Sequence, residues 1–251
     1  EAEAASGPPL SLAVFISSRN DQCYDDGRVA AIKRLAAAEQ ARINASGGVY
    51  GRPLELKFFD DERKEEKAVA NMRAALADPT LLAMIGLSSS TRGKAVFDAV
   101  GAEIGASKVP FVSDISVGSL FAGHDNVYTT RASQDEVRAP VMGEFTRAIG
   151  YQRPAFLGRT GAVYVDALAE GLKKVHGEGG LTADLRVAIE DDKIAEAALS
   201  DAISALRAAN PDIVYLAVNS RTTPDVIKAM TAAGMTPALF VSRISSLPQE
   251  L

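Results

Sequence analysis

The stretch LAMIGLSSSTRGKAVFDAVGAEIGA, residues 82–106, contains the strand–loop–helix unit that decides the fold. Its first five residues form a short apolar run, which predicts a buried strand at residues 82–86. A hydroxyl-rich loop follows and opens a helix that we expect at residues 91–106. Another apolar run, VPFVS, predicts the next strand at residues 109–113. A strand, a helix and a second strand in this order are typical of a parallel sheet.

The same alternation of strands and helices extends in both directions from this unit. Further strands are expected at residues 10–16, 53–59, 126–130, 154–158, 181–189, 212–218 and 238–242. Further helices are expected at residues 28–44, 62–77, 135–149, 163–176, 194–209 and 222–233. In two of these helices the spacing predicts inward-facing residues, which are Val29, Ile32, Leu35, Ala36 and Ile43 in one and Val137, Met142, Phe145 and Ile149 in the other. The pattern predicts an α/β protein in which helices cover both faces of parallel sheets.

One segment, residues 116–133, interrupts this rhythm. It is rich in Gly, Ser and Thr and shows no clear helix. We interpret it as the crossing between two α/β lobes of similar plan. The predicted domains are therefore an N-terminal lobe at residues 1–129 and a second lobe at residues 130–251.

Composition excludes several classes of function. The chain has 27 Lys+Arg against 32 Asp+Glu, a net charge of −5, which argues against binding to duplex nucleic acid. No apolar run approaches the roughly 20 residues that span a bilayer. Cys23 is the only cysteine, so we expect no internal disulfide. His124 is interpreted as a loop residue, and His176 as a helix end that is either solvated or complementary to the helix dipole. We expect no metal, no cofactor, no nucleic-acid partner and no membrane insertion of this segment.

Polar residues at the carboxyl ends of the predicted strands are the candidates for ligand binding, because ligands of open α/β sheets bind there. Ser88, Ser89 and Ser90 follow one strand directly and lead into a helix. Hydroxyls and free backbone N–H groups at a helix N-terminus favour an anion such as a carboxylate. The commoner role of such residues is to cap the helix. The two roles are compatible, because the cap needs only one hydroxyl.

Other strand ends carry further candidates. Asp114 follows the strand at residues 109–113, where it would accept a ligand hydrogen bond or cap a turn. Tyr164 begins a helix, where its ring would stack on a ligand or lie half-buried at the surface. Arg19, Arg221 and Arg243 follow three strands, either as solvated residues or as a grip for an anionic ligand.

Signatures of catalysis are missing from the sequence. It contains no G-x-S-x-G elbow, no phosphate-binding loop of the type G-x-x-x-x-G-K-[ST], and no G-x-G-x-x-G after its first strand. Cys23 has no nearby histidine that would activate it as a nucleophile. We therefore predict that the protein is not an enzyme.

A family resemblance adds to this picture. Residues 43–56, INASGGVYGRPLEL, followed by two aspartates at 60–61, resemble the first-lobe signature of type I periplasmic binding proteins, in the branch of the leucine/isoleucine/valine-binding protein. Residues 85–91 resemble the ligand-binding serine loop of that family, and residues 109–113 resemble its following strand. Tyr164 and the pair at 234–235 continue the match, which spans nearly the whole chain and is weaker in the second half.

The resemblance implies two Rossmann-like lobes that close on a small ligand. It implies that Ser88 binds the ligand carboxylate together with groups near Ser116. Tyr164 and Asn219 would then contact the ligand from the second lobe. The function expected is extracytoplasmic, periplasmic binding of a small carboxylate-bearing solute and its delivery to an ABC transporter permease. The alternatives are the sensing domain of a membrane signalling receptor and, less favoured, an α/β enzyme.

The sequence departs from the family pattern at two points. Amino-acid-binding relatives usually have an acidic residue after the last strand, whereas this chain has Arg243 at about that place. A cation there disfavours a ligand ammonium and favours an amine-free organic or aromatic acid. The second point is length, because the chain stops where family members continue. We therefore expect a C-terminally truncated fold, which would be a fragment, a chain completed by a partner segment, or a shortened relative.

Overall fold

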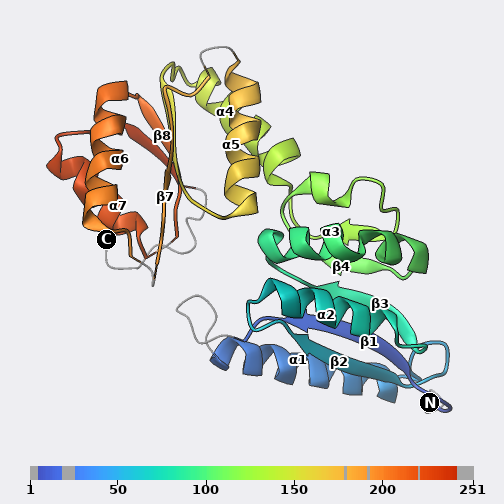
Figure 1. Cartoon of the computed structure of the whole chain (residues 1–251). Helices are drawn as coiled ribbons and strands as arrows, with labels where there is room; N and C mark the ends of the chain where they lie inside the picture. The colour runs from blue at the N-terminus through green and yellow to red at the C-terminus, as the bar shows by residue number, and fades with distance from the viewer. Residues whose placement is uncertain (1–4, 19–25, 178–179, 191–192, 220, 242–251) are drawn as a thin grey trace. The chain divides into compact units, whose positions relative to one another are not determined.

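The computed structural model describes residues 5–18, 26–177, 180–190, 193–219 and 221–241 (Figure 1). Its contacts divide the chain into two compact units, Glu1–Arg131 and Ala132–Leu251. Each unit has its own parallel sheet, so the α/β fold class that the sequence predicts is confirmed. The predicted domain boundary after residue 129 stays a prediction, because compactness in the folded chain does not show that either part folds alone.

The first unit contains a five-stranded parallel sheet in the order β2-β1-β3-β4-β5. Its strands are β1 (Leu10–Ile16), β2 (Leu54–Asp60), β3 (Leu81–Gly86), β4 (Phe111–Ser113) and β5 (Val127–Thr129). Its helices are α1 (Asp26–Ala45), α2 (Glu65–Leu76) and α3 (Ser90–Ser107), with a 3-10 turn at Gly118–Phe121. The segment that the sequence predicts as a crossing therefore supplies this turn and the edge strand β5 to the first unit.

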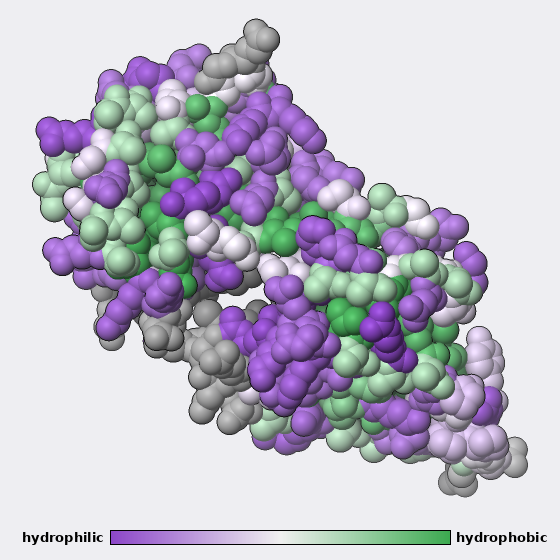
Figure 2. All heavy atoms as spheres, in the orientation of Figure 1, coloured by the Kyte–Doolittle hydropathy of each residue, from purple (hydrophilic) through white to green (hydrophobic). Residues whose placement is uncertain are grey.

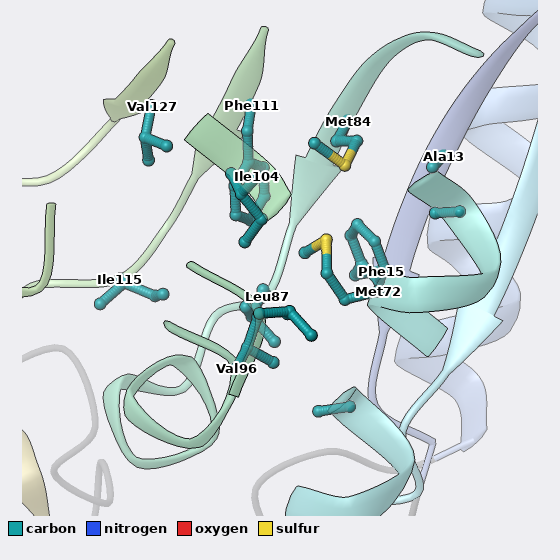
Figure 3. Close-up of a cluster of buried hydrophobic side chains, with 13 residues drawn as sticks. Ala13, Phe15, Met72, Met84, Leu87, Val96, Ile104, Phe111, Ile115 and Val127 are labelled. Atoms are coloured by element: carbon teal, nitrogen blue, oxygen red, sulfur yellow. The ribbon is translucent and has the colours of Figure 1, made fainter. Parts of the chain in front are cut away.

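The main core of the first unit lies between the sheet and helices α2 and α3. Figure 3 shows this cluster, in which Met72 of α2 lies beside the ring of Phe15 on β1. Phe111 of β4 is fully buried, and its ring centroid lies 6.0 Å from that of Phe15 and 6.4 Å from that of Phe97. Burial of these side chains is the main force that holds the two helices on this face.

The opposite face of the first sheet is covered unevenly. Helix α1 packs there over β1 and β2, where Val29 joins a small buried cluster. Val112 on β4 and Tyr128 on β5 are 37% and 56% exposed. The predicted inward face of α1 is wrong for Ile32 and Leu35, which are exposed. Among the described side chains of α1 only that of Val29 is buried, so the helix buries a narrower stripe than its apolar spacing predicts.

The second unit contains a four-stranded parallel sheet in the order β7-β6-β8-β9. Its strands are β6 (Pro154–Arg159), β7 (Ala183–Val187), β8 (Ile213–Ala217) and β9 (Ala238–Val241). A π-helical turn (Gln134–Arg138) leads into α4 (Ala139–Ala148), and the other helices are α5 (Val163–His176), α6 (Glu196–Ala209) and α7 (Thr223–Ala232). Separate buried clusters lie on the two faces of this sheet, one involving α4 and α5 and one involving α6 and α7.

The predicted inward face of α4 is largely wrong. Met142 is buried, but Val137, Phe145 and Ile149 are about half exposed. The helix instead buries its small residues, among them Ala139 and Gly143. A Cβ at Gly143 would overlap Val175 of α5, so the small face allows the two helices to approach closely.

The surface is mixed in character. Figure 2 shows hydrophilic and hydrophobic residues interspersed over the displayed face of each unit. Among the described residues, none of the helices combines the length and the apolar character that crossing a bilayer requires.

Candidate functional site

Strand order locates the candidate site in each unit. In the first sheet β1 lies between β2 and β3, and in the second β6 lies between β7 and β8. The connections on the two sides of β1, and of β6, leave toward opposite faces of the sheet, which opens a crevice at the carboxyl ends of the central strands. The residues that follow β1, β3, β6 and β8 are therefore the natural ligand contacts.

The serine loop, residues 87–90, follows β3 in the first unit. Gly86 and Leu87 both have positive φ angles, 108° and 60°, which turn the chain sharply out of the strand. Ser89 caps α3, because its Oγ accepts a hydrogen bond from the backbone N–H of Arg92 at 3.4 Å. Ser90 Oγ accepts from the backbone N–H of Ser116 at 3.3 Å. Two of the three hydroxyls therefore stabilise the loop itself.

Ser88 differs from its two neighbours. It is half-buried, and within the described residues its hydroxyl makes no hydrogen bond. The capping role and the ligand role that the sequence leaves open thus fall to different residues, with Ser89 as the cap. An uncommitted hydroxyl beside a helix N-terminus is suited to an anionic group.

Asp114 and Ser116 follow β4, the neighbour of β3. Asp114 pairs with Arg131, whose Nε lies 2.5 Å from its Oδ1, and it also accepts from Thr130 Oγ1 at 3.3 Å. Ser116 is buried and joins the serine loop through Ser90. The structure therefore brings Ser88, Ser89, Ser90, Asp114 and Ser116 to one edge of the first sheet. Asp114 serves there chiefly to hold the chain after β5.

Tyr164 and Asn219 follow β6 and β8, at the corresponding edge of the second sheet. Tyr164 is the second residue of α5 and packs partly against the adjacent core. Asn219 Oδ1 accepts from the backbone N–H groups of Arg221 and Thr222 at 3.1 and 2.8 Å and from Thr222 Oγ1 at 2.8 Å. These contacts shape the turn that begins α7, so the amide oxygen of Asn219 has a local structural role.

Three arginines complete the account of the predicted site. Arg19 and Arg243 lie outside the described residues. Sequence reasoning does not single out Arg159 as a ligand contact, although the rule of strand ends applies to it equally. It ends β6 and is half-buried, and no hydrogen bond or ion pair to its guanidinium is found in the described part of the chain. An unpaired cation at this edge of the sheet is available to an anionic ligand.

A buried ion pair lies next to the serine loop. Asp61 directly follows β2, and its Oδ2 lies 2.7 Å from Nε of Arg92 in the first turn of α3. Their side chains are 5% and 10% exposed. Ser17, after β1, donates to Asp61 Oδ1 at 2.7 Å and accepts from Arg92 Nη2 at 3.0 Å. Sequence reasoning missed this network, because nothing local to either charged residue indicates its partner.

A second polar network lies in the core of the second unit. The hydroxyl of Tyr215, a fully buried residue on β8, contacts the hydroxyl of Thr146 and lies 3.0 Å from His176 Nε2. Of the two expectations for His176, solvation is wrong, because its ring is half-buried and hydrogen-bonded, whereas complementarity to the dipole of α5 stays a prediction. Burial and, second, the charge of Arg147 lower the pKa of His176 below its ordinary 6.5, while Glu144 acts in the opposite direction.

This pKa direction predicts a loss of stability in mild acid. Because the folded chain protonates His176 at lower pH than the unfolded chain, the free energy of unfolding should fall as pH drops through 6.5 and level off below the folded pKa. One proton limits the slope to about 1.4 kcal/mol per pH unit. Urea unfolding of the wild type and His176→Gln between pH 5 and 8 measures this. An equal pH slope in the variant would contradict the assignment.

The described residues contain no group of three or more His, Cys, Asp or Glu side chains that could hold a metal ion. The edge of the first sheet presents hydroxyls and the backbone N–H groups of a helix start, together with the Asp114 carboxylate, which is paired with Arg131. The edge of the second sheet presents the ring of Tyr164, the amide of Asn219 and the guanidinium of Arg159. The hydroxyl and N–H groups of the first edge, and separately the cation of the second, can each bind an anionic group.

Comparison with known proteins places these observations in context. A family model described as periplasmic binding protein matches residues 28–247. The chain is similar to the solved leucine-binding protein of Thermotoga maritima, with 19% identity and a TM-score of 0.69 over 92% of this chain and 63% of that one. It is also similar to a branched-chain amino acid transporter substrate-binding protein of Streptococcus pneumoniae in complex with isoleucine, with 14% identity and a TM-score of 0.69 over 93% and 64%.

A third similar structure is an ABC transporter solute-binding protein of Rhodopseudomonas palustris in complex with 3,4-dihydroxybenzoic acid. It has 13% identity and a TM-score of 0.67 over 96% of this chain and 66% of that one. The chain thus spans slightly less than two thirds of the length of these three proteins. At these identities the likeness establishes the fold alone. The comparison with curated proteins gives no match.

Proposed function

The chain belongs to the periplasmic binding protein family, and from that premise we propose that it binds a small carboxylate-bearing solute outside the cytoplasmic membrane. Its α/β units with parallel sheets have the type I periplasmic-binding-protein fold. The proposed role is to deliver the solute to an ABC transporter permease in the periplasm, with binding and release but no chemical transformation.

The observation that carries this proposal is the division of roles within the serine loop. Ser89 caps α3 and Ser90 holds Ser116, whereas the Ser88 hydroxyl makes no hydrogen bond within the described residues. A carboxylate placed at the start of α3 would accept from Ser88 and from backbone N–H groups, and it would be favoured by the positive end of the helix dipole. Such charge-assisted hydrogen bonds are stronger than those between neutral groups.

Cations in the second unit favour a ligand without an amine. Arg159 ends β6 without a partner in the part of the chain that the structure describes, and Arg243 follows β9 in the sequence. Two of the similar solved proteins hold isoleucine and 3,4-dihydroxybenzoic acid, both of which carry a carboxylate. We infer that the ligand of this chain is an aromatic or aliphatic acid without an amine rather than an amino acid. Tyr164 would then stack on an aromatic ring.

A thermal-shift screen with defined probes tests the ligand class. The probes are L-leucine, L-isoleucine, 4-methylpentanoate as the amine-free analogue of leucine, and 3,4-dihydroxybenzoate. A bound acid should stabilise the protein by about 2.7 kcal/mol at a hundredfold excess over Kd. Binding of the amino acids but not of 4-methylpentanoate would contradict the inference from the arginines. Failure of every small solute to bind would contradict the proposed function.

Ser88→Ala should weaken binding of a carboxylate hit. Loss of one hydrogen bond to a charged group corresponds to about a 10- to 100-fold increase in Kd. Ser107→Ala is the matched control, because Ser107 lies at the far end of the same helix and donates to the Ile104 carbonyl. Isothermal titration calorimetry measures both variants. If Ser88→Ala binds as tightly as Ser107→Ala, Ser88 does not contact the ligand.

A further inference from the structure

Arg92 is an unexpected residue for its position. It is the third residue of α3, where the positive end of the helix dipole disfavours a cation. Its side chain is also largely withdrawn from water, which disfavours any unpaired charge. Both effects oppose an arginine here, so the residue requires a compensating interaction. Asp61 supplies it through the 2.7 Å contact to Arg92 Nε.

The carboxylate of Asp61 is itself held firmly. Its backbone N–H donates to the Ile16 carbonyl at 3.0 Å, and its own carbonyl accepts from Lys64 at 2.8 Å. Its Oδ1 accepts from Ser17 Oγ and from the backbone N–H of Arg63, both at 2.7 Å. The ends of β1 and β2 are thus joined at Asp61, which gives Arg92 a fixed point to bind.

From Arg92 the contacts continue into the serine loop. Its backbone N–H donates to Ser89 Oγ, and the loop is held on its other side by the bond between Ser90 Oγ and the Ser116 N–H. The first turn of α3 is therefore tied to β1 and β2 on one side and to the segment after β4 on the other. Ser88 immediately precedes Ser89 and Ser90, the two serines through which these attachments hold the loop.

We propose that the buried Asp61–Arg92 pair, bridged by Ser17, is a positioning element that fixes the serine loop in its ligand-binding geometry. Because Asp61 neutralises Arg92, the pair acts through geometry and adds no net charge to the site. The contacts alone support the claim that the pair orders the serine loop. The claim that this ordering strengthens ligand binding rests also on the proposed function.

Hydrogen–deuterium exchange of the ligand-free protein tests the positioning role. Asp61→Asn keeps the size and acceptor oxygen of the side chain but removes the charge. It should raise the exchange rate of amides in residues 86–93 at least tenfold. Arg92→Lys keeps the charge but loses the paired N–H groups, and it should give a smaller increase in the same peptide. Unchanged exchange in residues 86–93 would overturn the proposal.

Asp78→Asn is the matched control. Asp78 also accepts from a lysine, Lys57 Nζ at 2.8 Å, and from a serine, Ser11 Oγ at 2.6 Å. It lies before β3, whereas the serine loop follows the carboxyl end of that strand. The control should raise exchange near residues 78–81 and leave residues 86–93 unchanged. If both variants raise the exchange rate of residues 86–93 equally, Asp61 contributes to the overall stability of the unit and does not specifically position the serine loop.

Two further measurements complete the test. If Asp61→Asn does not fold, the double variant Asp61→Asn/Arg92→Gln replaces the ion pair by a neutral pair and is compared with Asp78→Asn in the same way. With 3,4-dihydroxybenzoate or 4-methylpentanoate as probe, Asp61→Asn should raise Kd at least tenfold well below the melting temperature, and Asp78→Asn should not. If the wild type binds neither probe, the proposed ligand class fails, while the exchange result still decides whether the pair positions the loop.

Discussion

Gly86→Ala is expected to prevent the first unit from folding stably. Gly86 is the last residue of β3 and has a φ angle of 108°, a conformation that side chains of L-residues rarely adopt. A Cβ at this position would also overlap the carbonyl oxygen of Phe15 on the neighbouring strand β1. The strained conformation costs about 1–3 kcal/mol and the overlap about 1–3 kcal/mol more. Urea unfolding followed by far-UV circular dichroism measures the loss.

Gly123→Ala separates the two contributions. Gly123 lies in the same unit with a φ angle of 82°, and a Cβ there would meet no atom within 4 Å. It should therefore show the cost of the backbone conformation without the overlap. If Gly86→Ala is no less stable than Gly123→Ala, the close approach of β3 to β1 at Gly86 is not the constraint described above.

Phe111→Ala should be the most damaging truncation in the core of the first unit. The ring of Phe111 is fully buried on β4 between Phe15 and Phe97, and its removal leaves a cavity that these neighbours fill only in part. Substitutions of this kind cost about 3–5 kcal/mol. The same urea titration measures the effect. Because β4 leads directly to Asp114 and Ser116, the variant should also raise hydrogen exchange in that loop.

Val112→Ala is the control for this prediction. Val112 is the next residue of the same strand and points to the opposite face, where it is 37% exposed. Its truncation should cost less than about 1 kcal/mol. Comparable losses for the two variants would show that the face covered by α2 and α3 does not dominate the stability of the unit.

Most strands and helices could be predicted from the sequence, because apolar runs alternate with helical segments along the chain. Helix α5 has the predicted bounds, and β3 differs by one residue. The buried faces of α1 and α4 could not be predicted. Leu35 of α1 and Phe145 of α4 both have the spacing of inward residues, yet both are exposed. In α4 the buried face is instead the one with small residues, such as Ala139 and Gly143. Hydrophobic spacing identifies a helix but does not tell which neighbour it meets.

The candidate site could be located from the sequence but its internal roles could not. The rule that ligands bind at strand ends indicates Ser88, Ser90 and Ser116 before any coordinates are known, and the hydrogen bond between Ser90 and Ser116 agrees with it. The assignment of these residues to a ligand stays a prediction. The Asp61–Arg92 pair joins residues 31 positions apart in the sequence, and no pattern within either segment indicates the other.

The parallel strand pairing also has a consequence for the order of events during synthesis. All described strand pairs lie within residues 1–131 or within residues 132–251. The central strand β1 pairs with β2 and β3, so its hydrogen bonds are complete only after β3 has been synthesised. Neither partner strand belongs to the second unit. Residues 132–251 then take roughly 6–24 s to synthesise at about 5–20 residues per second. All strands of the first sheet are therefore synthesised before those of the second, and their described pairing uses no residue that is made later.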